Sequence, residues 1–82
     1  MRLDKYLKVS RLIKRRTVAN EACDAGRVSV NGKPARASYD VKIGDKLTIA
    51  LGTREITAEV VSVQETVAKN DAALLYKLLV IL

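Results

Sequence analysis

The chain of 82 residues contains no histidine, tryptophan or phenylalanine, and it has a single cysteine. Without histidine it lacks the side chain that most often transfers protons near neutral pH, and Cys23 has no histidine to activate it as a nucleophile. A single cysteine also excludes an internal disulfide bond, which fits a reducing cytoplasm. These absences argue against an enzyme, and we expect Cys23 to be a small buried apolar residue.

Signatures of cofactor and metal sites are also missing. The four glycines stand apart in the chain, so there is no glycine-rich phosphate loop, and no group of cysteine and histidine residues offers metal ligands. The acidic residues are scattered, and no pair of them is typical of a hydrolase. We therefore expect no catalytic residues, no cofactor and no metal.

Long apolar runs are absent as well. The segment "LLYKLLVIL" spans the nine residues 74–82 and is interrupted by Lys77, whereas a membrane-spanning helix needs about 20 apolar residues. The first residues contain no apolar run of the length found in signal peptides. We expect a cytoplasmic protein that makes no contact with a membrane, consisting of one domain over residues 1–82.

What the chain does have is positive charge, concentrated in its first half. The net charge is +6, with 15 Lys or Arg and nine Asp or Glu. Residues 1–46 carry twelve basic and five acidic residues, a net charge of +7, while residues 47–82 carry three and four, a net charge of −1. This asymmetry predicts a polyanionic partner for the first half, either nucleic acid or an anionic membrane surface. Binding to a membrane surface would require a long amphipathic helix, and the predicted helices are short.

The sequence "LDKYL" predicts a short helix near the start of the chain. Its apolar side chains follow the spacing of one helix face, at positions Leu3, Tyr6 and Leu7. Asp4 is placed to pair with Lys8 one turn later, and Ser10 is expected to end the helix. Because Tyr6 lies on the apolar face, we expect it in the core.

A second short helix is predicted over residues 18–25. Thr17 is interpreted as its N-cap, because a threonine hydroxyl can accept a hydrogen bond from a free amide of the first turn. Gly26 follows as the residue that takes a positive φ after the last turn. The inward face is predicted to contain Val18, Ala22 and Ala25, with Ala19 and Cys23 beside it.

The middle of the chain predicts antiparallel strands. Val28 to Val30 alternate apolar and polar residues before an Asn31-Gly32 turn of type I′, and Pro34 places the return strand at an edge. Further strands are expected over residues 46–51 and from residue 54 onward. The segment "NDAALLYKLL", residues 70–79, predicts a last helix. The expected fold class is α+β, with two short helices packed on a small antiparallel sheet plus a C-terminal helix.

The opening segment is the strongest functional signal. Lys and Arg neutralise phosphates and release counterions, and an arginine side chain can bind phosphate oxygens through two nitrogens. For any single basic residue, the alternative is that it belongs to a solvated surface and does not contact RNA. Tyr6 and Tyr39 are the only aromatic residues of the first half, which favours structured, double-helical RNA over single strands. The predicted RNA-binding residues are Arg2, Lys5, Lys8, Arg11, Lys14, Arg15, Arg16 and Thr17, extended by Arg27 and Lys33.

Several short motifs occur together between residues 2 and 50. They are Arg2-Leu3-Asp4, a basic stretch leading to Thr17, Gly-x-Val-x-Val-Asn-Gly from Gly26 to Gly32, and Val-x-x-Gly-Asp from Val41 to Asp45. In this combination the chain resembles the αL RNA-binding domain, first named from the fourth protein of the small ribosomal subunit. The remaining residues, 51–82, are interpreted as an extension of this motif by a strand and the C-terminal helix. The second helix departs from many members of the superfamily, because Asn20, Glu21 and Asp24 stand where basic residues are common.

Within this superfamily, the segment "MRLDKYLKVSRLIKRRT" of residues 1–17 most closely resembles the RqcP family, which is related to heat shock protein 15. The resemblance implies a bacterial factor of ribosome quality control. It would bind 23S rRNA and peptidyl-tRNA on an obstructed large ribosomal subunit and assist its partner RqcH in adding C-terminal alanine tails. Arg2 and Arg16 would be the principal RNA contacts, and Asp4 either orients basic residues or makes a structural salt bridge. Recycling of large subunits, as by heat shock protein 15, and general binding of structured RNA remain alternatives. Independently of the resemblance we expect a monomer, with a dimer through the apolar C-terminal end as the alternative.

Overall fold

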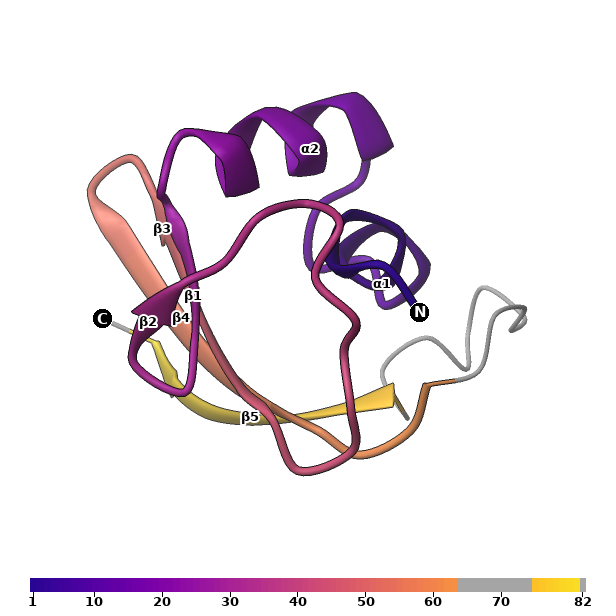
Figure 1. The fold of residues 1–82 in the computed structure, drawn as a ribbon. Coiled ribbons are helices and arrows are strands. Elements are labelled where there is room, and N and C mark those ends of the chain that lie inside the picture. Colours follow the sequence, from indigo (N-terminus) through magenta and orange to yellow (C-terminus); the bar gives the residue numbers. More distant parts are fainter. Residues whose placement is uncertain (64–74, 82) are drawn as a thin grey trace.

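The computed structural model describes residues 1–63 and 75–81, which form two helices and five strands. The helices are α1 (Leu3–Val9) and α2 (Arg16–Asp24). The strands are β1 (Val28–Val30), β2 (Lys33–Pro34), β3 (Lys46–Leu51), β4 (Arg54–Val60) and β5 (Tyr76–Ile81). Figure 1 shows that the ends of α1 and α2 meet near the start of the chain, away from the turn between β3 and β4.

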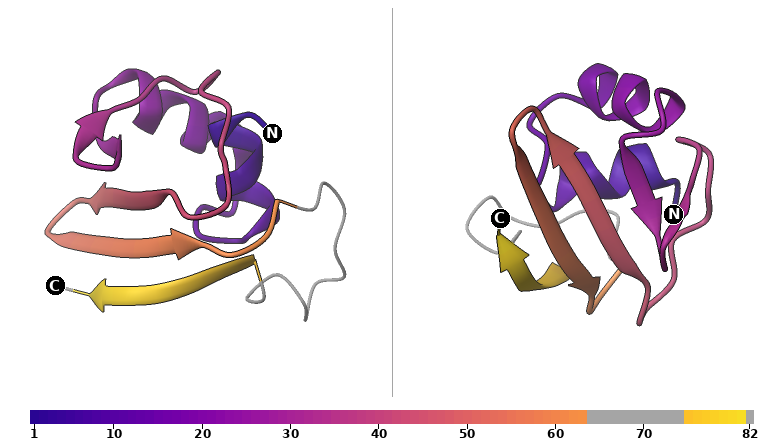
Figure 2. Two further views of the ribbon diagram at one scale, coloured as in Figure 1. Left: turned by 60° about the horizontal axis from the view of Figure 1, so that its bottom comes forward. Right: turned by 90° about the vertical axis from the view of Figure 1, so that its left-hand side faces the viewer.

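The five strands form one antiparallel sheet in the order β2-β1-β3-β4-β5. Both helices lie on the same side of this sheet, so the fold has two layers (Figure 2). The α+β prediction of two short helices on a small antiparallel sheet is confirmed. This arrangement leaves β2 and β5 at the two edges of the sheet, with α1 and α2 over its inner face.

The predicted hairpin between β1 and β2 is confirmed in detail. Asn31 and Gly32 have φ angles of 52° and 85°, as a type I′ turn requires, and these angles favour asparagine and glycine. Pro34, in the edge strand β2, pairs with Ser29 of β1. Proline has no N–H to donate, and it is tolerated here because no further strand lies beyond the edge to need that donor.

Helix α1 follows its predicted pattern, with Ser10 as the C-cap, but α2 differs from its prediction at the start. The helix begins at Arg16 with Arg15 as the N-cap, so the prediction of Thr17 as N-cap is wrong. Arg15 has the extended backbone conformation of an N-cap and makes no side-chain cap, and Thr17 lies two residues later, inside the first turn. At the other end, the amides of Gly26 and Arg27 donate to carbonyls of the last turn and confirm the predicted C′ glycine.

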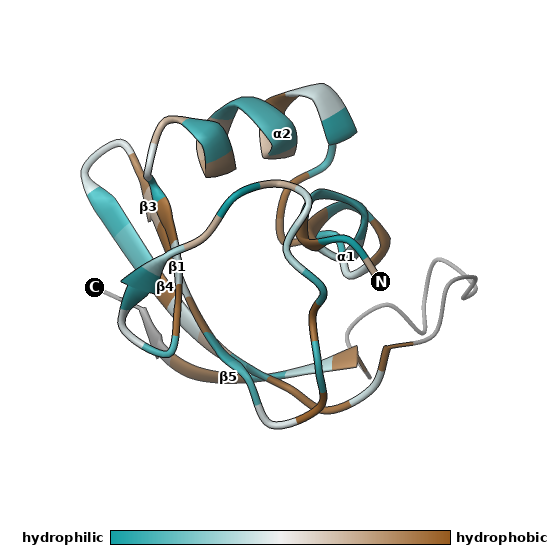
Figure 3. Ribbon diagram, viewed as in Figure 1, coloured by the Kyte–Doolittle hydropathy of each residue, from teal (hydrophilic) through white to brown (hydrophobic). Residues whose placement is uncertain are grey.

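The buried face of α2 is rotated from the predicted one. Ala19, Ala22 and Cys23 are buried, whereas Val18 is 45% exposed and Ala25 is exposed, so the inward placement of these two residues is wrong. Two tertiary hydrogen bonds set this rotation, because Asn20 donates to Asp4 and Asp24 accepts from the amide of Ala37. Figure 3 shows hydrophilic residues on the outer side of α2 and hydrophobic ones toward the sheet.

The core lies between the helices and the sheet and is aliphatic apart from Tyr6 and Cys23. Its fully or almost fully buried members are Leu3, Tyr6, Leu7, Ala19, Cys23, Val28, Leu47, Ile49, Val60 and Leu75. The predictions that Tyr6 and Cys23 are buried are confirmed. The Tyr6 hydroxyl donates a 2.6 Å hydrogen bond to the Leu75 carbonyl. Burial, with smaller contributions from nearby Asp4 and Asp24, raises the pKa of Cys23 to about 11 and keeps the thiol neutral.

The predicted C-terminal helix is wrong for residues 76–79, which belong to β5, and residues 70–74 lie outside the described part. Tyr76 pairs with Val60 and Leu78 with Ala58, which satisfies the backbone of the otherwise open edge of β4. This long-range pairing outweighs the helical propensity of Leu and Lys, because propensity is a weak preference that tertiary contacts override. In the described residues, neither helix has the length and apolar character needed to cross a bilayer.

Candidate nucleic-acid interface

Arg2 and Arg16 are brought together by the packing of the starts of the two helices. Arg2 is the N-cap of α1 and forms an isolated antiparallel bridge with Asp40, which holds the chain end against the loop before β3. Arg16 is the first residue of α2. Their side chains are 50% and 48% exposed, so both guanidinium groups reach solvent.

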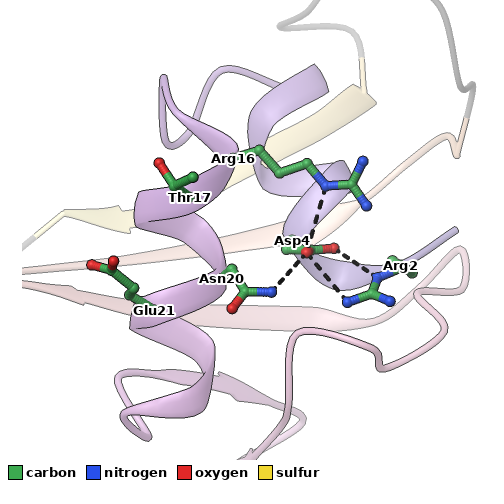
Figure 4. Close-up of a pocket in the computed structure, with 6 residues that line it drawn as sticks. All are labelled: Arg2, Asp4, Arg16, Thr17, Asn20 and Glu21. Atoms are coloured by element: carbon green, nitrogen blue, oxygen red, sulfur yellow. Dashed lines mark hydrogen bonds and ion pairs between the residues drawn. The ribbon is translucent and has the colours of Figure 1, made fainter.

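The buried carboxylate of Asp4 lies between the two arginines (Figure 4). The side chain of Asp4 is only 3% exposed. Its Oδ1 accepts from the Lys5 amide at 2.8 Å and from Arg2 Nε at 3.2 Å. Its Oδ2 accepts from Asn20 Nδ2 at 3.2 Å and lies 3.5 Å from both Arg2 Nη2 and Arg16 Nε. One carboxylate therefore connects the first turns of both helices.

The environment of Asp4 keeps its carboxyl group ionised at neutral pH. Burial by itself raises the pKa of Asp4, because a charged group loses hydration. Hydrogen bonds from Asn20, Arg2 and the Lys5 amide, together with the charge of Arg16, outweigh burial and lower the pKa below its usual value of 3.8. The buried negative charge thus has several donors, and it orients two positive groups at the surface.

The cluster presents unused donors to an open pocket. Figure 4 shows the terminal nitrogens of Arg16 directed away from Asp4, which contacts only its Nε. Thr17, Asn20 and Glu21 complete the lining of the pocket. The first turn of α2 contains no acidic residue and has no side-chain cap, so its positive dipole end adds to the arginine charges. This arrangement is suited to binding phosphate oxygens.

The other predicted residues are not among those that line this pocket. Lys5 and Lys8 lie on α1, with Lys5 partly buried; Arg11, Lys14 and Arg15 are exposed on the segment that joins the helices. Arg27 follows α2 and lines a different pocket with Leu51, and Lys33 lies on β2 and lines a third. Arg15 thus directly precedes the start of α2, whereas Lys8 and Arg11 lie at the end of α1 and Arg27 and Lys33 line other pockets.

Comparison with known proteins shows the family to which the chain belongs. The family model of the S4 domain matches residues 1–47. Proteins named "RQC P-site tRNA stabilizing factor" from Bacillus subtilis and Halalkalibacterium halodurans are 54% and 56% identical to the chain. These matches cover 96% and 94% of this chain and 92% and 88% of the relatives. The chain belongs to this family of S4-domain proteins.

A solved structure supports the same fold for the S4 domain and its extension. The trimeric structure of Vibrio cholerae heat shock protein 15 matches with a TM-score of 0.89 and 31% identity, over 96% of this chain and 81% of that one. The resemblance to the αL RNA-binding domain and to the RqcP family, predicted from the sequence, is confirmed.

One residue that contacts Asp4 was missed by the sequence prediction, and one predicted pairing of Asp4 was wrong. Asn20 was interpreted as a departure from the family pattern, yet it donates to Asp4. Its position four residues after Arg16, on the same helix face, was the available signal. The predicted pairing of Asp4 with Lys8 is wrong, because Asp4 is buried at the contact between the helices while Lys8 is exposed.

Proposed function

We propose that this protein is a ribosome quality-control factor that binds the obstructed large ribosomal subunit through 23S rRNA and peptidyl-tRNA. In this role it acts in the cytoplasm as a monomer and supports the alanine tailing of stalled chains by RqcH. The observation that carries the RNA-binding step is the pair of half-exposed arginines, Arg2 and Arg16, held by the buried Asp4. The names of the relatives, which specify a P-site tRNA, support the choice of RNA.

The physical argument for this proposal is pre-organisation. A free arginine side chain loses rotamer entropy when it binds a phosphate, whereas Arg2 and Arg16 are already oriented by contacts to Asp4 at 3.2 and 3.5 Å. The exposed Lys14 and Arg15 next to them add long-range attraction for the RNA backbone. Contacts of this kind position an RNA without reading its sequence, which suits a structured ribosomal target.

The role that we propose is not catalytic. The only cysteine has a raised pKa and is 2% exposed, so it offers no thiolate nucleophile near neutral pH. The carboxylate of Asp4 is engaged by backbone and side-chain donors and has a lowered pKa, which does not suit a general base.

A second candidate function is the recycling of obstructed large subunits without tailing. The observation that favours it is the fold likeness to heat shock protein 15 at a TM-score of 0.89. The two functions predict different outcomes in cells that lack the gene. If the protein supports tailing, alanine tails on stalled chains should fall in the deletion strain and return with the wild-type gene; unchanged tails would favour recycling.

Sedimentation with purified large subunits tests the shared RNA-binding step. We expect the wild-type protein to travel with subunits that hold peptidyl-tRNA and the Arg16→Ala variant to bind about 10- to 100-fold more weakly, which corresponds to one charge-assisted hydrogen-bonding group. Arg54→Ala is the matched control, because it removes the same charge from an exposed position on β4. Equal binding by the two variants would contradict the proposed role of the Arg2–Asp4–Arg16 cluster.

A further inference from the structure

A second pocket lies between the β1–β2 hairpin and residues 35–39, the segment that leaves β2 in Figure 1. Its volume is about 650 Å³, within the range of small-molecule sites. The side chains that matter for its chemistry are Lys33, Pro34, Arg36 and Tyr39. These residues combine two positive charges with a proline and an aromatic ring, outside the Arg2–Asp4–Arg16 cluster.

The wall of this pocket is held in place by Asp45, which is 9% exposed. Asp45 Oδ2 accepts from the Tyr39 hydroxyl at 2.9 Å and from the Lys42 amide at 3.0 Å, and Oδ1 accepts from Asn31 Nδ2 at 3.1 Å. Asn31 Oδ1 in turn accepts from the Lys46 amide at 3.0 Å. The hairpin turn and the Tyr39 ring are thereby tied to one buried group, so the ring is a fixed part of the wall.

Tyr39 is well suited to act as a platform for a flat ligand. It is only partly buried, and its hydroxyl remains a donor because the hydrogen bond to Asp45, with smaller contributions from burial and nearby carboxylates, raises the pKa of Tyr39. Pro34 lies in the edge strand and adds a second rigid apolar surface. Aromatic and proline surfaces of this kind bind the faces of nucleic-acid bases, which all have a π system.

The charges of the pocket favour an anionic group beside that base. Lys33 and Arg36 are exposed, and neither forms an ion pair with another described residue. The nearest carboxylate to Tyr39, that of Asp45, is already engaged by three donors. A pocket with two available cations next to an aromatic ring is complementary to a phosphate and its base.

We propose that this pocket binds one unpaired nucleotide of the RNA target. The base lies against Tyr39 and Pro34, while Lys33 and Arg36 contact its phosphate. This inference rests on the proposed function and deepens it. With the Arg2–Asp4–Arg16 cluster on the RNA backbone and this pocket on a base, the protein would select an RNA helix that carries an unpaired nucleotide. It also reverses the expectation, drawn from the scarcity of aromatic residues, that base stacking has little part in binding.

The test compares two synthetic RNA hairpins, one fully paired in its stem and one with a single unpaired nucleotide in the stem. Their affinities are measured by fluorescence anisotropy at one salt concentration. The wild-type protein is expected to bind the RNA with the unpaired nucleotide about tenfold more tightly, which is the usual effect of stacking one base. Tyr39→Leu should abolish this preference without changing the affinity for the paired RNA.

Two further variants separate stacking from other effects. Tyr39→Phe keeps the ring, so it should keep most of the preference although it loses the hydrogen bond to Asp45. Arg16→Ala should weaken binding to both RNAs by the same factor. If the wild type shows no preference, or if Tyr39→Leu and Tyr39→Phe lose it equally, the inference is wrong. If Arg16→Ala changes neither affinity while Tyr39→Leu still abolishes the preference, the nucleotide pocket stands and the proposed role of Arg16 fails.

Discussion

Replacing Asp4 with asparagine separates the positioning of the arginines from the effect of net charge. The change raises the net charge from +6 to +7. If RNA binding depended on charge alone, Asp4→Asn would bind RNA more tightly. If Arg2 and Arg16 bind RNA because Asp4 orients them, the same substitution should weaken binding. The two explanations therefore predict opposite signs.

The expected loss of stability follows from the contacts of Asp4. An asparagine amide oxygen can replace Oδ1 and keep the Lys5 amide and Arg2 Nε, at 2.8 and 3.2 Å in the native protein. Its NH₂ group then replaces Oδ2 and faces the donors of Asn20 and Arg16. Loss of the hydrogen bond from Asn20, and of the ion pair with the half-exposed Arg16 at the value of a surface pair, costs about 2 kcal/mol together. For a domain of this size, that lowers the melting temperature by roughly 8–16 °C.

Thermal unfolding and RNA anisotropy are the measurements for this variant. We expect Asp4→Asn, at a temperature where it remains folded, to bind RNA about tenfold more weakly because the arginines lose their orientation. Glu21→Gln is the control, since it removes the same charge from an exposed residue of the same pocket and should leave stability within about 0.5 kcal/mol. Binding by Asp4→Asn as tight as that of the wild type would refute the positioning role of Asp4.

Two further predictions concern stability. Tyr6→Phe removes the buried 2.6 Å hydrogen bond to the Leu75 carbonyl and should reduce the free energy of unfolding by about 1–3 kcal/mol, measured by urea denaturation. Tyr76→Phe is the control, because Tyr76 in β5 is only partly buried, and it should have a smaller effect. If Tyr6→Phe and Tyr76→Phe are equally stable, the hydrogen bond of Tyr6 contributes little to stability. For acid stability, hydrogen bonds outweigh burial at both Asp4 and Asp45 and lower the pKa of each carboxyl below 3.8. The ionised groups therefore stabilise the fold at higher pH, and this contribution is lost as the pH falls through the lowered pKa values. Urea midpoints should change little between about pH 5 and 7 and fall below about pH 4, less steeply for Asp45→Asn, and an equally steep fall in that variant would contradict the assignment.

The sequence alone determined the elements whose signals are local. Asn31-Gly32 specifies a turn with two positive φ angles, and the alternation around it specifies strands, because both depend on neighbouring residues. The helical spacing of Leu3, Tyr6 and Leu7 likewise predicted α1 and its buried face. The concentration of basic residues in residues 1–46 predicted a polyanionic partner, because the net charge of a segment can be counted from its sequence without knowing the fold.

Tertiary structure decided what depends on contacts between distant segments. Within β5, Lys77, Leu78 and Leu79 favour a helix whereas Tyr76, Val80 and Ile81 favour a strand, and pairing with the edge of β4 decides for the strand. The apolar residues of α2 allow two inward faces, and the bonds from Asn20 to Asp4 and from Ala37 to Asp24 select one. Asp4 could pair with Lys8 by spacing, but the packing of α1 against α2 buries it between Arg2 and Arg16. Sequence spacing describes neighbours along the chain, whereas the position of a charged group depends on which surfaces the core brings together.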